Sequence, residues 1–198
     1  MGGCTNRAEI YKVGNHMKLL AENGCSARST ISDVSMHPNP PRTAADPPLE
    51  IEIWCMMQIP SDKDRAWGLK NIWASIWAEG AGEWPGSGEV DFLEFCGGGG
   101  CPGEPESNFH SLSTRESSNV PGWEKYNNNW PTQFYNNLMH IYVVWELNQM
   151  TIYAGTASDS REQMKKVAYI NNWKINDGTD FYKGWAFVMD VKRYDAIG

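Results

Sequence analysis

Three carboxylates lie close together in the segment 84–95, which reads WPGSGEVDFLEF. They are Glu89, Asp91 and Glu94, and the residues between them are Val, Phe and Leu. This pattern predicts a strand, on which alternate side chains share a face, so Glu89 and Asp91 lie together. Strict alternation would send Glu94 to the other side. A single-residue β-bulge between Asp91 and Glu94 restores the parity and brings all three acids to one face.

Acids held this close have a specific use in catalysis. Like charges cannot all ionise easily, so we expect one carboxyl to keep its proton near neutral pH. A protonated acid beside an ionised carboxylate is the pair that cleaves a glycosidic bond. Same-face neighbours lie about 6–7 Å apart along a strand, and their carboxyl groups can approach the about 5–5.5 Å separation of a retaining glycosidase. The alternative is a solvated acidic strand face; Trp73, Trp77 and the Trp-Pro lead argue against it.

The segment resembles the signature of glycoside hydrolase family 16, and within it the laminarinase-type enzymes, whose signature carries the extra bulge residue. The resemblance implies a concanavalin-like β-jelly roll with a concave substrate groove and a retaining mechanism. It implies Glu89 as the nucleophile, Glu94 as the general acid and base, and Asp91 as the residue that orients Glu89. Weaker likeness extends over residues 59–61, 71–77, 141–145, 151–153 and 188–194. The sequence departs from the family at 54–58, which lacks the usual Glu and Arg, and at 169–183, which is short and polar.

The elements that must position these acids are mostly strands. Pro and Gly punctuate the chain throughout, as is typical of short strands joined by turns. We expect an all-β fold, a β-sandwich or jelly roll of two antiparallel sheets with a concave substrate groove, in a single domain over residues 1–198. We expect strands over 49–59, 139–147, 150–154 and 186–191, with a turn at 148–149 between the second and the third. The capping-box spacing of Ser160 and Gln163 favours a helix over 160–168. The segment 67–77 fits either a helix or a strand, and 97–107 reads as a loop.

Several further side chains are candidates for substrate binding. Trp73 and Trp77 share a strand face and could stack on sugar rings, although packing in the core is the alternative for each. His110 follows the acidic strand by one loop, and family members often have a His near the reacting sugar; a structural His is the alternative. Trp123 and Trp130 suit sugar recognition or a loop anchor, Trp145 suits the core, and Glu104 and Glu106 read as solvated. Asp190 could belong to a calcium site of the kind that some relatives have, although the sequence shows no cluster of oxygen ligands near it.

Composition limits the classes of function. The chain has 198 residues, 41% of them hydrophobic and 21% charged, which indicates a globular protein. Its net charge of −7 and the lack of a basic patch argue against nucleic acid as a partner. Apolar runs are too short to span a membrane. The start MGGCTNRAEIYK resembles no signal peptide, although a polymeric substrate would favour an extracellular location.

The cysteines predict no metal centre. Five is an odd number, so at least one thiol is unpaired in a monomer. Cys96 and Cys101 flank four glycines and could form a disulfide. No CxxC pair or HExxH motif is present, so we expect no zinc site and no cofactor, with calcium as the exception noted for Asp190. The expected partner is a polysaccharide, bound by a monomer.

These observations favour a retaining endo-glycosidase acting on β-1,3-glucan or mixed β-1,3/1,4-glucan. Alternatives within the enzyme class are a galactan hydrolase and a transglycosylase. A carbohydrate-binding protein without turnover is the alternative from a different class, and a structural sandwich with surface acids is a third possibility.

Overall fold

The computed structural model describes residues 8–13, 16–21, 26–31, 41, 43–57, 72–84, 87–97, 105–110, 123–132, 134–147, 149–171 and 185–193. Within these residues the fold is all-β, with one short 3-10 turn at Asn127–Asn129 and no helix that could cross a bilayer. The strands are β1 (Ala8–Val13), β2 (His16–Ala21), β3 (Ser26–Ile31), β4 (Leu49–Cys55), β5 (Ile72–Gly80), β6 (Glu89–Cys96), β7 (Pro105–His110), β8 (Trp123–Lys125), β9 (Met139–Glu146), β10 (Gln149–Thr156), β11 (Lys165–Ile170) and β12 (Trp185–Arg193).

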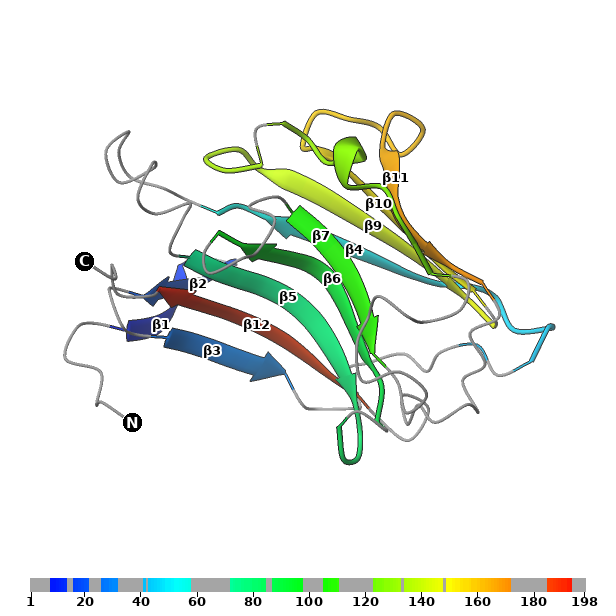
Figure 1. The fold of residues 1–198 in the computed structure, drawn as a ribbon, viewed down its shortest axis with the longest axis horizontal. Helices are drawn as coiled ribbons and strands as arrows, with labels where there is room; N and C mark the ends of the chain where they lie inside the picture. The colour runs from blue at the N-terminus through cyan, green and yellow to red at the C-terminus, as the bar shows by residue number, and fades with distance from the viewer. Residues whose placement is uncertain are drawn as a thin grey trace.

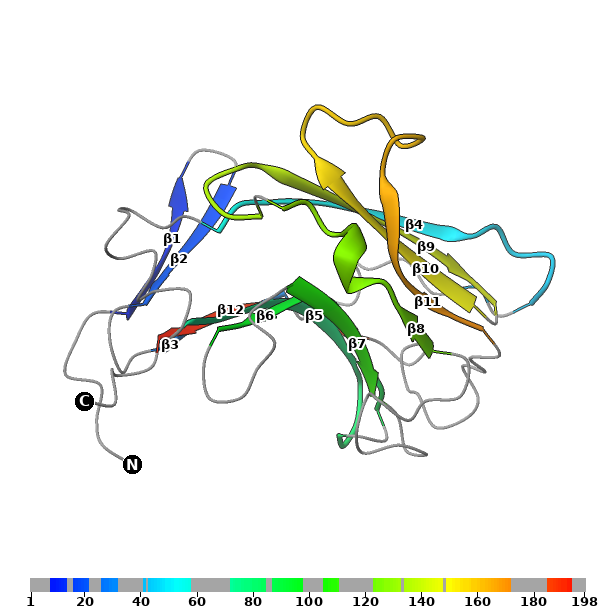
Figure 2. The same cartoon turned by 45° about the horizontal axis from the view of Figure 1, so that its top comes forward.

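Two five-stranded antiparallel sheets form the sandwich (Figure 1). One sheet has the order β4-β9-β10-β11-β8 and the other the order β3-β12-β5-β6-β7, while β1 and β2 form a separate hairpin. Figure 2 shows the two sheets stacked face to face, with β5 and β7 curving away from the β4-β9-β10-β11-β8 sheet along their length. The outer face of the β3-β12-β5-β6-β7 sheet therefore lies on the inside of this bend. The expected jelly-roll sandwich of two antiparallel sheets is confirmed.

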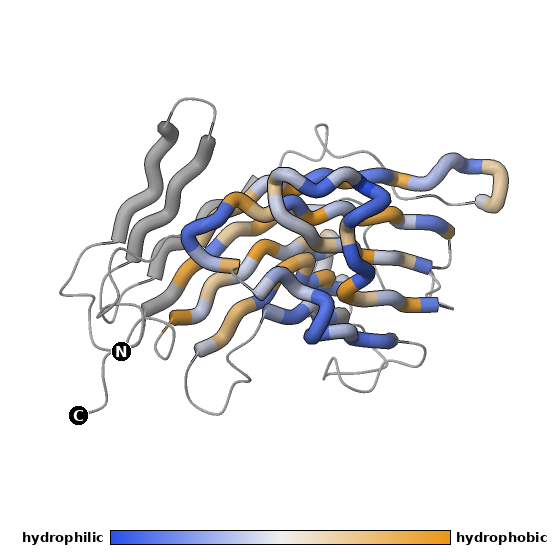
Figure 3. Tube along the Cα trace, turned by 90° about the horizontal axis from the view of Figure 1, so that it is seen from above, coloured by the Kyte–Doolittle hydropathy of each residue, from blue (hydrophilic) through white to orange (hydrophobic). Residues whose placement is uncertain are grey.

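The core lies between the sheets, and strands such as β9 direct alternate apolar residues toward it (Figure 3). In β9 the inward residues Met139, Ile141, Val143 and Trp145 are all at most 1% exposed. Trp145 lies 6.4 Å from Trp185 of the facing sheet, between ring centroids, so it packs in the core as expected.

The helix expected over 160–168 is wrong. Gln163 and Met164 donate their backbone N–H groups to the Ser160 carbonyl, and the Gln163 side chain accepts from the Ser160 N–H at 2.9 Å. The capping spacing therefore closes one turn. The chain then enters β11, whose Val167, Ala168 and Ile170 are buried. Pairing of β11 with β10 gives this segment a buried face that an isolated helix would lack.

Other expected boundaries move by a few residues. Gln149 already pairs with Glu146 and belongs to β10, so the turn expected at 148–149 does not include Gln149. The ambiguous segment before residue 77 is a strand from Ile72 onward, and its earlier part lies outside the described residues. The expected loop 97–107 ends early, because β7 begins at Pro105.

Two cysteines are defined by the structure. Cys96 is disulfide-bonded, and its expected partner Cys101 lies outside the described residues. Cys55 is a free thiol packed against the core, and burial raises its pKa to about 12. A thiol with so high a pKa is a poor nucleophile near neutral pH.

Candidate active site

A β-bulge in β6 brings the three acids to one face. On β5 the alternating residues Glu79, Trp77 and Ser75 lie opposite Glu89, Asp91 and Glu94. Only two steps on β5 separate Trp77 from Ser75, whereas three steps on β6 separate Asp91 from Glu94, and the register with β7 shifts at the same place. The expected bulge is therefore present, and the extra residue lies between Asp91 and Glu94.

The apolar residues of β6 pack inward. Val90, Phe92 and Phe95 are at most 1% exposed and Leu93 is also buried. Phe92 stacks on Phe187 of β12 with ring centroids 6.1 Å apart. Since the apolar side chains occupy the core, the acids must lie on the outer face of the sheet. This anchoring holds the carboxylates on a rigid strand.

Asp91 is the buried member of the three, at 5% exposure, whereas Glu89 and Glu94 are half-buried. Burial raises the pKa of the Asp91 carboxyl well above its usual range. The carboxylates of Glu94, Glu106 and Asp190 raise this pKa further, and the Lys125 ammonium lowers it. Asp91 thus holds its proton more tightly than an ordinary aspartic acid does, as expected for one member of a crowded acid group.

Replacing Asp91 by Asn should stabilise the fold increasingly as the pH rises. The folded state binds the Asp91 proton more tightly than the unfolded chain does, so this residue's contribution is fully present below its unfolded pKa. The contribution is lost as the pH rises through the raised folded pKa. Asn is uncharged at every pH and avoids that loss. Urea unfolding of Asp91→Asn and the unaltered protein at pH 4 and pH 8 measures the difference.

A control of opposite sign is available in the same fold. Backbone and side-chain hydrogen bonds from Thr156 lower the pKa of Asp159, so its contribution to stability is present above the unfolded pKa and lost on acidification. Asp159→Asn should therefore be less stable than the unaltered protein, more so at pH 8 than at pH 4. A stability difference between Asp91→Asn and the unaltered protein that is the same at both pH values would contradict the raised pKa of Asp91.

Strand β7 supplies polar neighbours that the sequence interpretation did not identify. Asn108 lies opposite Asp91, is 4% exposed, and donates its Nδ2 amide hydrogen to Oε2 of Glu94. The Lys125 ammonium, from β8 of the other sheet, donates to Asn108 Oδ1 at 3.0 Å and to Glu106 Oε2 at 2.9 Å. The expectation that Glu106 is a solvated loop residue is wrong, because it lies on a strand and forms an ion pair beside the acids.

On the other side of β6, the Trp-rich strand β5 holds the tryptophans expected near the substrate. Trp73 and Trp77 share the face of the acids, and Trp73 is 36% exposed. Trp77 is half-buried, and its indole N–H donates to Asp190 Oδ2 of β12 at 3.2 Å. The Ser75 hydroxyl donates to Asp190 Oδ1 at 2.9 Å. Trp73 thus offers an open ring on this face, and Trp77 is held in place through Asp190.

Both oxygens of Asp190, considered above as a calcium ligand, accept these side-chain hydrogen bonds. Among the described residues, no group of three or more His, Cys, Asp or Glu side chains is arranged to hold a metal ion.

The structure gives less information on the other residues that the sequence suggested as substrate contacts. The backbone of His110 pairs with Glu89, which puts it at the register position next to the first acid, and its side chain lies outside what the structure describes. Trp130 is 5% exposed and belongs to the core, so it anchors its loop. Trp123 is described only as backbone in β8, and Glu104 lies outside the described residues.

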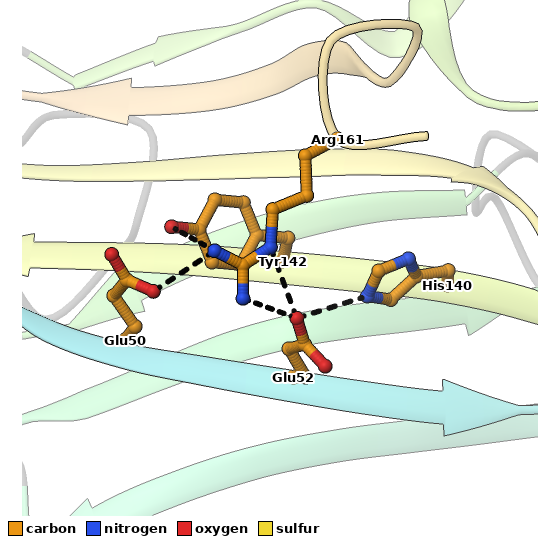
Figure 4. A network of polar contacts seen from close by, with 5 residues as sticks. All are labelled: Glu50, Glu52, His140, Tyr142 and Arg161. Carbon is orange, nitrogen blue, oxygen red and sulfur yellow. Dashed lines mark hydrogen bonds and ion pairs between the residues drawn. The ribbon is translucent and has the colours of Figure 1, made fainter. Parts of the chain in front are cut away.

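A second polar cluster lies on the outer face of the other sheet (Figure 4). The Arg161 guanidinium donates to Glu50 and Glu52 and lies 4.3 Å from the Tyr142 ring centroid. Hydrogen bonding from Arg161 lowers the pKa of Glu52, and His140 Nε2 lies 4.0 Å from Glu52 Oε1. One cation thus serves both carboxylates and ties the turn before β11 to β4. The Arg161 guanidinium thereby stabilises the ionised form of Glu52.

A pocket of about 730 Å³ lies at the loop between β8 and β9 and the end of β10. Its described lining includes Trp130, Leu138, Thr156 and Lys165, and its carboxylate is Asp159. Because Asp159 accepts two hydrogen bonds from Thr156, it closes a turn. The acids of β6 do not line this pocket, so the outer face of the β3-β12-β5-β6-β7 sheet remains the candidate site.

No family model matches the chain, and no curated protein sequence matches it. Solved structures with a similar fold include a non-specific endo-β-1,3(4)-glucanase from family GH16, at 15% identity and a TM-score of 0.43, over 73% of this chain and 46% of that one. The catalytic domain of an endo-1,3-β-glucanase (laminarinase) from Thermotoga petrophila RKU-1 is 12% identical, with a TM-score of 0.47, over 94% of this chain and 64% of that one.

A third structure belongs to a study of endo-acting O-glycanases that human gut microbiota express to initiate mucin breakdown. It is 13% identical, with a TM-score of 0.49, over 94% of this chain and 65% of that one. The chain thus spans about half to two thirds of the length of these structures. The similarity is one of fold.

Proposed function

We propose that this protein is a retaining endo-glycosidase that hydrolyses β-1,3-linked or mixed β-1,3/1,4-linked glucan. The observation that supports it best is the bulge between Asp91 and Glu94, which gives Glu89, Asp91 and Glu94 a common outer face. The acids of a solvated strand face would be exposed, whereas Asp91 is only 5% exposed and lies among other carboxylates. The choice of glucan follows the resemblance of residues 84–95 to laminarinase-type enzymes.

In the first step the Glu89 carboxylate attacks the anomeric carbon while the bond to the glycosidic oxygen breaks. Glu94 transfers its proton to that oxygen, so the leaving sugar departs as an alcohol. The product is an ester between Glu89 and the glycosyl group, with inverted configuration. In the second step Glu94 takes a proton from water as the water oxygen attacks the same carbon, and Glu89 leaves as a carboxylate. The two inversions amount to retention.

Asp91 lies between the two glutamates in this scheme. Its raised pKa lets it stay protonated while Glu89 is ionised, so three adjacent negative charges are avoided. A protonated Asp91 can donate a hydrogen bond that orients the nucleophile. Trp73 and Trp77 would stack on sugar rings beside the acids, and His110 would contact the reacting sugar.

The proposal is tested by incubating the protein with laminarin, lichenan, agarose and xyloglucan and measuring new reducing ends. Cleavage of laminarin or lichenan, with retained configuration in the first product by proton NMR, is the expected result. Cleavage of agarose alone would indicate a galactan hydrolase, and altered chain lengths without new reducing ends a transglycosylase. Binding without any reaction would indicate a carbohydrate-binding protein and overturn the proposed enzyme.

A further inference from the structure

We propose that Asn108 and Lys125 are positioning residues that determine which oxygen of Glu94 carries the catalytic proton. The inference rests on the proposed function, in which Glu94 is the general acid. It uses two residues from different sheets: Asn108 lies on β7, and Lys125 lies on β8 at the edge of the opposite sheet. Edge strands β7 and β8 contact one another, so the ammonium can reach across from one sheet to the other.

Lys125 selects the orientation of the Asn108 amide. An ammonium group has only donors, so the amide atom that it approaches at 3.0 Å has to be the oxygen. The NH₂ group then points the opposite way, toward Glu94. The second bond of the ammonium, to Glu106 at 2.9 Å, holds Lys125 in this place. Because Asn108 is 4% exposed, rotation of its amide would leave buried polar atoms without suitable partners.

The Asn108 amide in turn distinguishes the two oxygens of Glu94. Its Nδ2–H donates to Oε2, which therefore acts as the acceptor. An amide donor bonds a carbonyl-type oxygen better than the hydroxyl of a carboxylic acid, so the proton of neutral Glu94 resides on Oε1. Oε1 is then the atom that gives its proton to the leaving oxygen. The same hydrogen bond favours the ionised form of Glu94, since donors stabilise a carboxylate more than the neutral acid.

Other charged groups surround Glu94 and set the background of its titration. They are Glu89 and Asp91 on its own strand, Glu106 opposite it on β7, Glu79 on β5, Asp190 on β12 and Lys125 on β8. Those carboxyl groups that are ionised oppose ionisation of Glu94, whereas Lys125 and the Asn108 amide favour it. Loss of either of these two groups should therefore move the Glu94 titration to higher pH.

The experiment follows the Glu94 side-chain carboxyl by carbon-13 NMR during a pH titration, with the signal assigned by its absence in Glu94→Gln. In Asn108→Leu the midpoint of the Glu94 titration should rise by about 0.5 to 1 pH unit, which corresponds to the loss of one hydrogen bond. Lys125→Met, which alters a partly exposed side chain, should raise it in the same direction. Lys166→Met is the matched control. Lys166 lies on β11, where its ammonium contacts the rings of Tyr126 and Tyr169 and does not bond to Asn108.

A double variant separates positioning from simple charge. If Lys125 acts through the amide, Lys125→Met should shift the midpoint less in the Asn108→Leu background than in the unaltered protein. Equal shifts in both backgrounds would show that Lys125 acts through its charge alone and would overturn its role. An unchanged midpoint in Asn108→Leu would overturn the role of Asn108.

Kinetics adds a readout that a merely structural role would not move. In Asn108→Leu the high-pH limb of the kcat/KM profile should move to higher pH by the same amount as the NMR midpoint. For substrates with poor leaving groups, the fold-decrease in kcat should exceed the fold-increase in KM. A uniform loss at every pH and for every leaving group would contradict a positioning role. The NMR titration needs no substrate, so it tests the roles of Asn108 and Lys125 even if the protein cleaves none of the four polysaccharides. Absence of cleavage would count against the proposed function alone.

Discussion

Glu89→Gln is expected to abolish turnover while leaving polysaccharide binding nearly intact. The amide has the shape of the carboxylate but no negative charge, so it cannot form the glycosyl ester. Loss of a covalent nucleophile should lower kcat on the order of 10⁴-fold or more. The hydrogen bonds and stacking contacts that bind the ground state remain, so the dissociation constant for a laminarin oligosaccharide should change by less than about tenfold. Reducing-end assays and isothermal titration calorimetry measure the two effects.

Two controls make this result specific. Glu146→Gln is the same chemical change on β9 of the other sheet, where Glu146 accepts a hydrogen bond from Gln149, and it should keep full activity. Glu89→Ala leaves room for a small anion, and azide should restore turnover and produce a glycosyl azide of inverted configuration. If Glu89→Gln retains most of the activity, another residue is the nucleophile.

Glu94→Gln should lose activity in proportion to the basicity of the leaving group. An amide cannot transfer a proton to the glycosidic oxygen, so polysaccharide cleavage, with a sugar alkoxide as leaving group, should slow about 10²- to 10⁴-fold. An aryl glycoside with an acidic phenol needs little protonation. Its kcat/KM, which reports formation of the glycosyl ester, should fall less than about tenfold.

A series of aryl glucosides of different phenol pKa measures this dependence for both proteins. The slope of log kcat/KM against the phenol pKa should be steeper in Glu94→Gln than in the unaltered protein. Deglycosylation still requires a base, so the intermediate should accumulate on activated substrates and a burst of phenol should precede slow turnover. Equal losses on good and poor leaving groups would mean that Glu94 is not the acid.

The bulge was predictable because it follows from local parity. On a regular strand, the acids at positions 89, 91 and 94 cannot share one face while the apolar residues at 90, 92, 93 and 95 share the other. One extra residue between Asp91 and Glu94 resolves the conflict, and the registers with β5 and β7 place it there. The tryptophans of β5 share that face for the same reason of alternation.

The segment after Ser160 was not predictable because its local signal is ambiguous. The Ser160 and Gln163 pair forms the contact that the sequence suggests, yet the contact closes a single turn. Whether the following residues continue as helix or strand depends on a neighbour. Here β10 provides an edge with which Lys165–Ile170 can pair.

The surroundings of the acids were beyond the sequence for a related reason. The alternation of Glu106, Asn108 and His110 could have indicated that β7 continues the polar face, but nothing near Lys125 marks it as a neighbour of that strand. Asp190 reaches Trp77 from 113 residues away along the chain.

The sequence by itself determined an all-β chain with three acids on one face of one strand, since alternation and a bulge act over a few residues. Only the tertiary structure decided which groups surround those acids: Asp190 and Glu106 to oppose ionisation, and Lys125 and Asn108 to favour it. Electrostatic and hydrogen-bond effects depend on distances between segments far apart in the chain, and those distances exist only after the two sheets have packed.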